Sequence, residues 1–272
     1  MTILIKLLGD DYPAALQTFY RQAAGLLVLT PLILRNPRTV FRTTRLGILL
    51  FRALASTIGM ILAFYAYQKM PLADANALSF TRTLWLVPFA AFVLQEHVGP
   101  RRLSATLVGF LGALLMLQPS AQANMGWPAA AALTSSLLFA LAVTGMKVMT
   151  RDHTVTTLMA WSAVLGFVLA IPPAIFVWRW PAGVDLLLLG ALGVLGTITQ
   201  ACYIKGMSEG DAAVMAPIDY SRLVFAVIFG FVWFGEIPNA LTMAGAGVVI
   251  ASTIYITWRE AQLGKREASI RE

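Results

Sequence analysis

The stretch Ser79-Phe80-Thr81-Arg82 has a near copy later in the chain, Asp219-Tyr220-Ser221-Arg222, and the two arginines are 140 positions apart. Each copy lies inside an apolar segment long enough to cross a membrane, since about 20 residues of helix span the hydrocarbon core. Moving a guanidinium out of water costs about 3 to 17 kcal/mol, so such an arginine normally faces a protein interior or a wet cavity. Two arginines at matching places in two halves indicate one shared cavity.

The composition predicts an all-α integral membrane protein. Apolar residues make up 58% of the 272 residues and charged residues 12%, which is about half the usual charged share. The net charge of +7 does not indicate nucleic acid as a partner, because the basic residues gather in short loops, where they set topology and contact the lipid bilayer. The single cysteine, Cys202, excludes a disulfide framework and a cysteine metal site.

The apolar segments predict nine full spans and one shorter piece. The piece, residues 1–8, reads as the tail of a span, and we expect that most of a first helix is missing from this chain. The predicted spans are 14–34, 45–67, 72–94, 101–118, 126–149, 155–178, 184–206, 211–234 and 238–258.

Internal repetition organises these spans into two halves. Polar and small residues recur at offsets near 140, which indicates two five-helix repeats over 1–119 and 126–258, followed by a tail over 259–272. An odd number of helices per repeat inverts the second repeat in the membrane, as in many secondary transporters. The alternative is chance matching between two segments of similar apolar composition. The matched pairs include Lys6 with Lys147, Asp11 with Asp152, Arg82 with Arg222, and Glu96 with Glu236.

The loop charges predict the orientation. With the 35–45 loop in the cytoplasm, strict alternation puts thirteen basic residues inside and three outside, a strong positive-inside bias. The C-terminus is then cytoplasmic, and we expect the protein in the inner, or plasma, membrane. The inside residues are Arg35, Arg38, Arg42, Arg45, Arg101, Arg102, Lys147, Arg151, Lys205, Arg259, Lys265, Arg266 and Arg271, and the outside ones are Lys6, Lys69 and Arg179.

Arg82 and Arg222 are the first candidates for substrate binding, because a guanidinium fork suits a carboxylate or phosphate. Asp219 lies three residues before Arg222 on the same helical face, so these two either neutralise each other or act on substrate. The position equivalent to Asp219 in the first half is Ser79. Arg82 therefore either pairs with Asp219 or awaits an anionic substrate group.

Other amphipathic side chains are candidates to line the same cavity. As a set they suit a cavity that accepts apolar or aromatic bodies as well as a charged end, although a single aromatic residue in a span more often packs or anchors. Glu96 and Glu236, by contrast, are expected to do structural work at the membrane surface. The further substrate-binding candidates are Tyr220, Tyr20, Tyr67, Trp161 and Gln200.

Glycines mark a different kind of segment. The segments 107–117 and 243–253 carry no charged residue and contain Gly109, Gly112, Gly245 and Gly247, as expected for close helix packing without a site. We assign them to scaffold or homodimer contacts.

Four stretches of the sequence are typical of one family of carriers. They are Met70-Pro71-Leu72-Ala73-Asp74-Ala75 through Leu94-Gln95-Glu96, Val108-Gly109-Phe110-Leu111-Gly112, Asp211-Ala212-Ala213 through Gly235-Glu236, and Ala244-Gly245-Ala246-Gly247. On these stretches the chain resembles the EamA family of ten-helix carriers in the drug/metabolite transporter superfamily. The resemblance covers nearly the whole chain and implies a carrier of amino acids, other metabolites or drugs, often working outward.

Three functions compete at this point. We expect a secondary transporter that exports amino acids or related small anions and zwitterions by alternating access. A cationic multidrug exporter is the alternative, although its substrate favours an acidic cavity. A non-transport membrane protein comes third: the sequence has no nucleophile motif or phosphate loop, and with only His97 and His153 we expect no metal, no cofactor and no enzyme activity.

Overall fold

The computed structural model describes residues 1–9, 11–35, 40–92, 100–117, 126–149, 153–209 and 224–271. In these residues the chain is helical and contains no strand. The helices are α1 (Thr2–Leu7), α2 (Ala14–Arg35), α4 (Leu46–Lys69), α5 (Leu72–Ser79), α6 (Thr81–Phe92), α7 (Pro100–Leu117), α8 (Gly126–Met149), α9 (Val155–Ile175), α10 (Val184–Glu209) and α12 (Ala240–Arg271), with one further short helix over Val224–Phe234.

The predicted all-helical membrane fold is confirmed. Among the described helices, five are long and apolar enough to cross a membrane: α4, α9 and the segments Gly126–Met146, Val184–Cys202 and Ala240–Arg259. Two shorter helices, Leu103–Leu115 and Val224–Phe234, are also apolar. Helix α2 is as long as a span but carries buried polar side chains, including Gln17 and Thr18, which lower its mean hydropathy.

The span predicted over 72–94 is not one continuous helix. It breaks at Phe80, between α5 and α6. Side chains around the break compete for backbone carbonyls, since Ser79 Oγ donates to Asn76 O at 2.6 Å and Thr81 Oγ1 donates to Leu78 O at 2.6 Å. Such side-chain bonds weaken the regular helical ladder, and the Phe80 N–H accordingly bonds three residues back, to Ala77 O.

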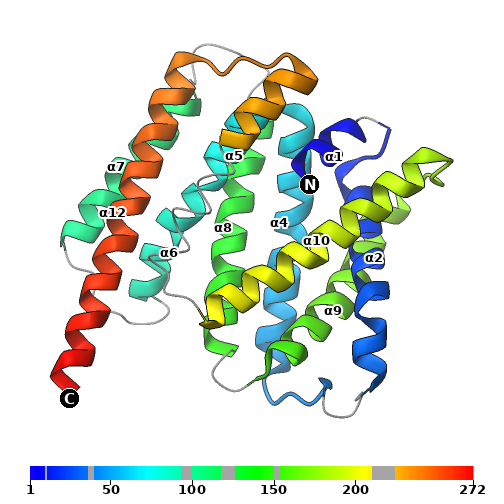
Figure 1. Ribbon diagram of the computed structural model, residues 1–272, viewed down its shortest axis with the longest axis horizontal. Coiled ribbons are helices and arrows are strands. Elements are labelled where there is room, and N and C mark those ends of the chain that lie inside the picture. Colours follow the sequence, from blue (N-terminus) through cyan, green and yellow to red (C-terminus); the bar gives the residue numbers. More distant parts are fainter. Residues whose placement is uncertain are drawn as a thin grey trace. The chain divides into compact units, whose positions relative to one another are not determined.

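The described chain divides into two compact units, and each unit draws on both halves of the sequence. The first unit contains Met1–Lys69 and Leu141–Lys205, and the second contains Met70–Ala140 and Gly206–Glu272. Within the first unit, α2 packs against α9 and α4, and α4 also packs against α9. Within the second unit, α12 lies along α7, as the orange-red and teal helices of Figure 1 show.

Glycines bring α7 and α12 together, as the sequence predicts. A Cβ on Gly112 would lie 2.8 Å from Val248 Cβ and 3.0 Å from the carbonyl oxygen of Gly245 on α12. A Cβ on Gly109 would lie 3.2 Å from Ser252 Cβ. Gly247 is different, because nothing lies within 4 Å of the position that its Cβ would occupy.

Gly235 and Glu236 act together within the second unit. Gly235 has φ +64° and ends the helix Val224–Phe234, with its N–H bonded to Phe231 O at 2.9 Å; a positive φ of this kind is typical of a glycine after a helix. The turn places Glu236 Oε2 2.8 Å from the backbone N–H of Leu72, the first residue of α5. Glu236 thus satisfies an N–H group that the helix itself leaves unpaired, which agrees with the structural role expected for it.

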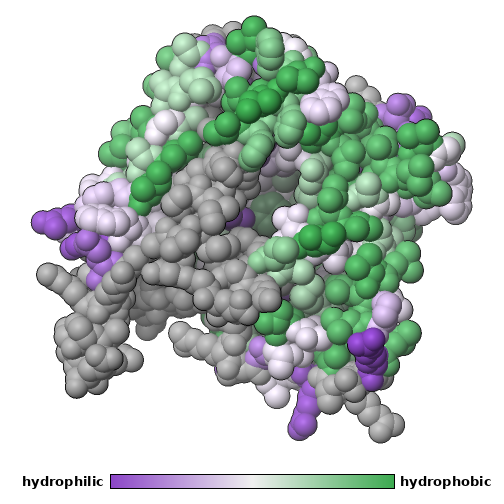
Figure 2. Space-filling view, in the orientation of Figure 1, coloured by the Kyte–Doolittle hydropathy of each residue, from purple (hydrophilic) through white to green (hydrophobic). Residues whose placement is uncertain are grey.

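The exposed surface of the described residues is rich in apolar side chains, as expected for a surface that faces lipid. Figure 2 shows broad green areas in this view, with purple hydrophilic residues toward the margins. Tryptophans near the ends of helices or of candidate spans are among the exposed residues: Trp127, Trp178, Trp180 and Trp258. Such positions suit the aromatic belt of a membrane protein.

Candidate functional site

A buried arginine, Arg52, lies between α4, α8 and α9 in the first compact unit. Its side chain is 5% exposed. Its guanidinium donates to Ser162 Oγ, and also reaches Leu158 O at 3.5 Å and Met146 Sδ at 3.9 Å. Ser162 Oγ in turn donates to Leu158 O. Nε of Arg52 is buried and has no acceptor in the structure.

A second arginine, Arg21, lies between α2, α4 and α10 in the same unit. Its Nη1 contacts Gln22 Oε1 at 3.1 Å and Met60 Sδ at 3.1 Å, and its Nη2 reaches Gly196 O at 3.5 Å. Its Nε is also buried without an acceptor. The absence of a side chain at Gly196 leaves room for this guanidinium on the surface of α10.

The two arginines share one chemistry. Each guanidinium meets a backbone carbonyl, a methionine sulfur and one neutral polar side chain, and a thioether is a weak acceptor. In the described part of the chain neither Arg21 nor Arg52 contacts a carboxylate. The first unit therefore holds two guanidinium groups that no described carboxylate neutralises, that of Arg52 buried and that of Arg21 half-buried. A carboxylate would bind either group more strongly than these neutral acceptors, because it carries a full negative charge and can accept two parallel N–H bonds.

The arginines lie at different depths along α4. Arg52 is on α4 itself, and Arg21 contacts Met60, which is eight residues further along the same helix. At 1.5 Å per residue this separation is about 12 Å along the helix axis. The first unit thus holds two guanidinium groups at two different levels along α4.

Of the predicted site residues in the first unit, Trp161 lies beside the Arg52 site. It directly precedes Ser162 on α9, its ring packs edge-to-face on Phe41 with centroids 5.4 Å apart, and its Nε1 is buried without an acceptor in the structure. Tyr20 instead joins an aromatic cluster with Phe19 and Trp178 and donates to Arg179 O at 3.1 Å. Tyr67 is buried near the end of α4, and Gln200 is exposed on α10.

Of the predicted residues in the rest of the chain, Arg82 is half-buried in the first turn of α6, directly after the break at Phe80. Ser79 is half-buried at the end of α5 and donates to Asn76 O. Thr81 Oγ1, between them, lies 2.7 Å from Ser136 Oγ of α8. Asp219, Tyr220 and Arg222 lie outside the described residues.

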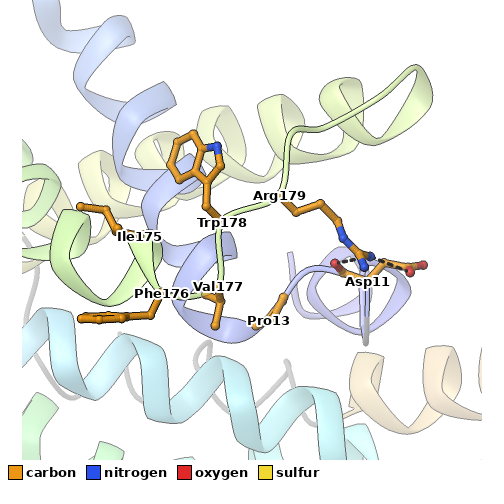
Figure 3. A pocket seen from close by; sticks show the side chains of 7 residues that line it. All are labelled: Asp11, Pro13, Ile175, Phe176, Val177, Trp178 and Arg179. Carbon is orange, nitrogen blue, oxygen red and sulfur yellow. Dashed lines mark hydrogen bonds and ion pairs between the residues drawn. The ribbon is translucent and has the colours of Figure 1, made fainter.

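An open pocket of about 400 Å³ lies where the end of α9 meets the turn between α1 and α2. Figure 3 shows Arg179 extended toward Asp11, with Trp178, Phe176 and Pro13 also lining the pocket. Nη1 of Arg179 contacts Asp11 Oδ1 at 3.2 Å, and these side chains are 60% and 85% exposed. The charges of this pocket are already paired and in contact with solvent, so it is a weaker candidate for substrate than the buried arginines.

Sequence reasoning passes over Arg52, although a simple signal marks it. Apart from Lys69 at its end, Arg52 is the one charged residue of the apolar segment 46–69, and an intramembrane ionisable residue is by itself a functional-site hypothesis. The repeat draws attention to arginines that have an arginine at the matching position in the other half, such as Arg82 and Arg222. Arg52 has no such counterpart, because the position 141 residues later is Gly193.

Comparison with known proteins identifies the family to which the chain belongs. The model of the EamA-like transporter family matches residues 1–118 and 126–258. The S-adenosylmethionine uptake transporter of Rickettsia felis is 26% identical over 265 residues, covering 97% of this chain and 90% of that protein. The pseudopaline exporter CntI of Pseudomonas aeruginosa is 26% identical over 258 residues, covering 94% and 90%.

A riboflavin transporter of Vibrio cholerae is 27% identical over 266 residues, covering 95% of this chain and 87% of that protein. One solved crystal structure aligns with a TM-score of 0.65 at 19% identity, over 96% of this chain and 95% of that one, which supports the fold alone. The chain belongs to the EamA-like transporter family. It is a multi-pass membrane protein that transports small molecules, as the family resemblance predicts.

Proposed function

We propose that this transporter carries small metabolites that bear a carboxylate, namely amino acids and related anions or zwitterions, and that it exports them by alternating access. One observation carries the proposal: Arg52 is buried, Arg21 is half-buried with its Nε atom buried, and no described carboxylate contacts either guanidinium. A buried charge normally has a partner, and a substrate carboxylate supplies one. The relatives include both uptake transporters and exporters, so the direction is a separate measurement.

The cationic multidrug exporter is the competing function. A cationic substrate needs acidic or aromatic partners, whereas the charges of the Arg21 and Arg52 sites are positive. An amino acid satisfies such a guanidinium with its carboxylate and presents its side chain to apolar neighbours such as Met146 and Trp161.

Transport by the purified protein in liposomes tests the proposal. We expect accumulation of at least one radiolabelled L-amino acid above empty liposomes, and no accumulation of tetraphenylphosphonium. Arg52→Gln lowers the initial rate about tenfold or more, because a hydrogen bond to a charged group contributes about 1.5 to 3 kcal/mol. Arg179→Gln makes the same chemical change at an exposed site and leaves the rate unchanged. Uptake of the cation without any amino acid overturns the proposal.

Arg82, Arg222 and Asp219 are proposed as further substrate ligands. Arg82→Ala and Arg222→Ala then weaken transport while the protein stays folded, and Arg→Lys recovers little because a point charge lacks the guanidinium fork. The double variant Asp219→Asn with Arg222→Gln separates binding from structure. Full transport in that variant contradicts a role in substrate binding.

The proposed orientation places the C-terminus in the cytoplasm of a cell with this protein in its inner membrane. The support is the positive-inside bias of the loops. Single cysteines introduced at Gln262 and at Pro181, after replacement of Cys202, are labelled from opposite sides of the membrane in this orientation. Labelling of both from the same side contradicts it.

A further inference from the structure

We infer that Arg52 and Trp161 form one carboxylate-binding subsite between α4 and α9. This inference rests on the proposed function, because it names where that carboxylate binds. It also makes a prediction of its own about binding, which is independent of transport.

The first step is the pair of buried donors without acceptors. Nε of Arg52 and Nε1 of Trp161 are both buried, and neither has a hydrogen-bond partner in the structure. A buried donor without an acceptor destabilises a protein, because it has lost its bonds to water and gained none in return, and native proteins contain few of them. Two such donors next to the same residue, Ser162, indicate a missing acceptor.

The second step is their placement on α9. Leu158, Trp161 and Ser162 are spaced by three and four residues, so they share one face of the helix. The guanidinium of Arg52 reaches this face at Leu158 O and Ser162 Oγ. Phe41 packs edge-to-face on the indole of Trp161 at an interplanar angle of 89°, and the same indole packs against the buried cluster that contains Leu158.

The third step is the role of Ser162. Its Oγ accepts from Arg52 and donates to Leu158 O. The hydroxyl oxygen thus occupies the position beside the guanidinium where an oxygen atom of an anion would bind. A carboxylate carries a full negative charge and can accept two parallel N–H bonds from the guanidinium fork, whereas the hydroxyl is neutral and offers one oxygen. A carboxylate therefore displaces the hydroxyl from Arg52 and accepts from the indole N–H as well.

The surroundings select the class of anion. One guanidinium balances one negative charge, which favours a carboxylate over a phosphate with nearly two charges. The neighbouring side chains are apolar, with Leu49, Met149 and Leu158 forming a buried cluster against which Trp161 and Met146 pack. The subsite thus fits the carboxylate of a molecule with an apolar or aromatic body.

A direct binding experiment uses the full chain, purified in detergent with ¹⁵N-labelled tryptophan. Titration with sodium phenylacetate is followed by the indole ¹H–¹⁵N resonances, and Trp161→Phe assigns the resonance of Trp161. We expect a downfield shift of that resonance with phenylacetate and none with phenylacetamide, which has the same shape without the charge. No shift, or an equal shift with the amide, overturns the inference.

Arg52→Gln removes the guanidinium and is expected to abolish the shift, but this variant can fail to fold. Variants of Ser162 test the subsite without changing Arg52. Ser162→Ala removes the competing hydroxyl, so phenylacetate is expected to bind more tightly, with half-maximal shift at a lower concentration. Ser162→Asp supplies a tethered carboxylate, so phenylacetate is expected to lose its effect on Trp161. An unchanged titration in Ser162→Asp also overturns the inference.

The outcome is separable from that of the proposed function. Amino-acid transport without a shift at Trp161 rejects the subsite and keeps the proposed function. A shift at Trp161 without amino-acid transport rejects the proposed function and identifies a carboxylate site with another use.

Discussion

A Cβ atom on Gly196 would lie 2.5 Å from Nε of Arg21 and 3.0 Å from its Cζ. The guanidinium therefore occupies the space that the missing side chain leaves on α10. This relationship ties a residue with no chemistry of its own to the position of a buried charge.

Gly196→Ala is expected to displace Arg21 and to lower transport about tenfold, the loss that corresponds to one hydrogen bond to a charged group. Gly190→Ala is the matched control on the same helix, because nothing lies within 4 Å of its Cβ position. Initial rates in liposomes measure the effect, and melting temperatures check that both variants are folded. Equal rates for the two variants contradict a role for the position of Arg21.

Glu236→Ala is expected to destabilise the second unit by about 0.5 to 2 kcal/mol, the usual effect of losing a helix N-cap. The N–H of Leu72 then loses its carboxylate acceptor. Glu236→Gln keeps a neutral acceptor and is expected to lose less. Thermal denaturation of the purified protein ranks the three forms, and a melting temperature of Glu236→Ala equal to that of the parent excludes the capping role.

Gly112→Ala is expected to weaken the packing of α7 on α12, because its methyl group meets Val248 and the backbone of Gly245. Overpacking of this kind costs about 1 to 3 kcal/mol. Gly247→Ala adds the same methyl group on α12 where space is open and is expected to be neutral. The comparison is made by thermal denaturation, and equal melting temperatures argue against the glycine contact.

Tyr12, in the turn between α1 and α2, is expected to make the protein sensitive to alkaline pH. Burial raises the pKa of Tyr12 above its ordinary value, and the hydrogen bond from its hydroxyl to Asp185 Oδ2 at 2.9 Å acts in the same direction. Because the pKa is higher in the folded state, this stabilisation is complete below the unfolded pKa of about 10. It is lost as the pH rises through the folded value.

Melting temperatures at increasing pH test this prediction. The decline above the ordinary tyrosine range is expected to be smaller in Tyr12→Phe, which cannot ionise. Parallel declines in the two proteins attribute the alkaline sensitivity to another group.

The membrane-spanning segments could be predicted from the sequence because length and apolar character are local properties. Helices α2, α4, α8 and α9 begin within one residue of their predicted starts at 14, 45, 126 and 155. The break at Phe80 could not be predicted from the same pattern. It depends on which carbonyls the side chains of Ser79 and Thr81 reach, and hydrophobic periodicity carries no information about that.

The site was only partly predictable for a related reason. The repeat directs attention to arginines that recur, yet Arg21 and Arg52 do not recur as arginine. At the offset of 141 positions, Arg21 aligns with Ser162 and Arg52 aligns with Gly193. In the structure, Arg52 contacts Ser162, and Arg21 lies against α10, the helix of Gly193 and Gly196. The contacts pair a charged residue in the first half with a small residue in the second, which no single segment reveals.

The first compact unit consists of two segments that are far apart in the sequence, so it cannot be complete until the second segment has been synthesised. Its residues run from Met1 to Lys69 and then from Leu141 to Lys205, so 205 − 69 = 136 residues separate the ends of its two pieces. At about 5 to 20 residues per second, the ribosome needs roughly 7 to 27 s to synthesise the residues between Lys69 and Lys205. The partners of the two arginines are made late in this interval, since Ser162 follows Arg52 by 110 residues and Gly196 follows Arg21 by 175. Until those residues are made, neither guanidinium has the contact to the second half of the chain that the folded unit gives it.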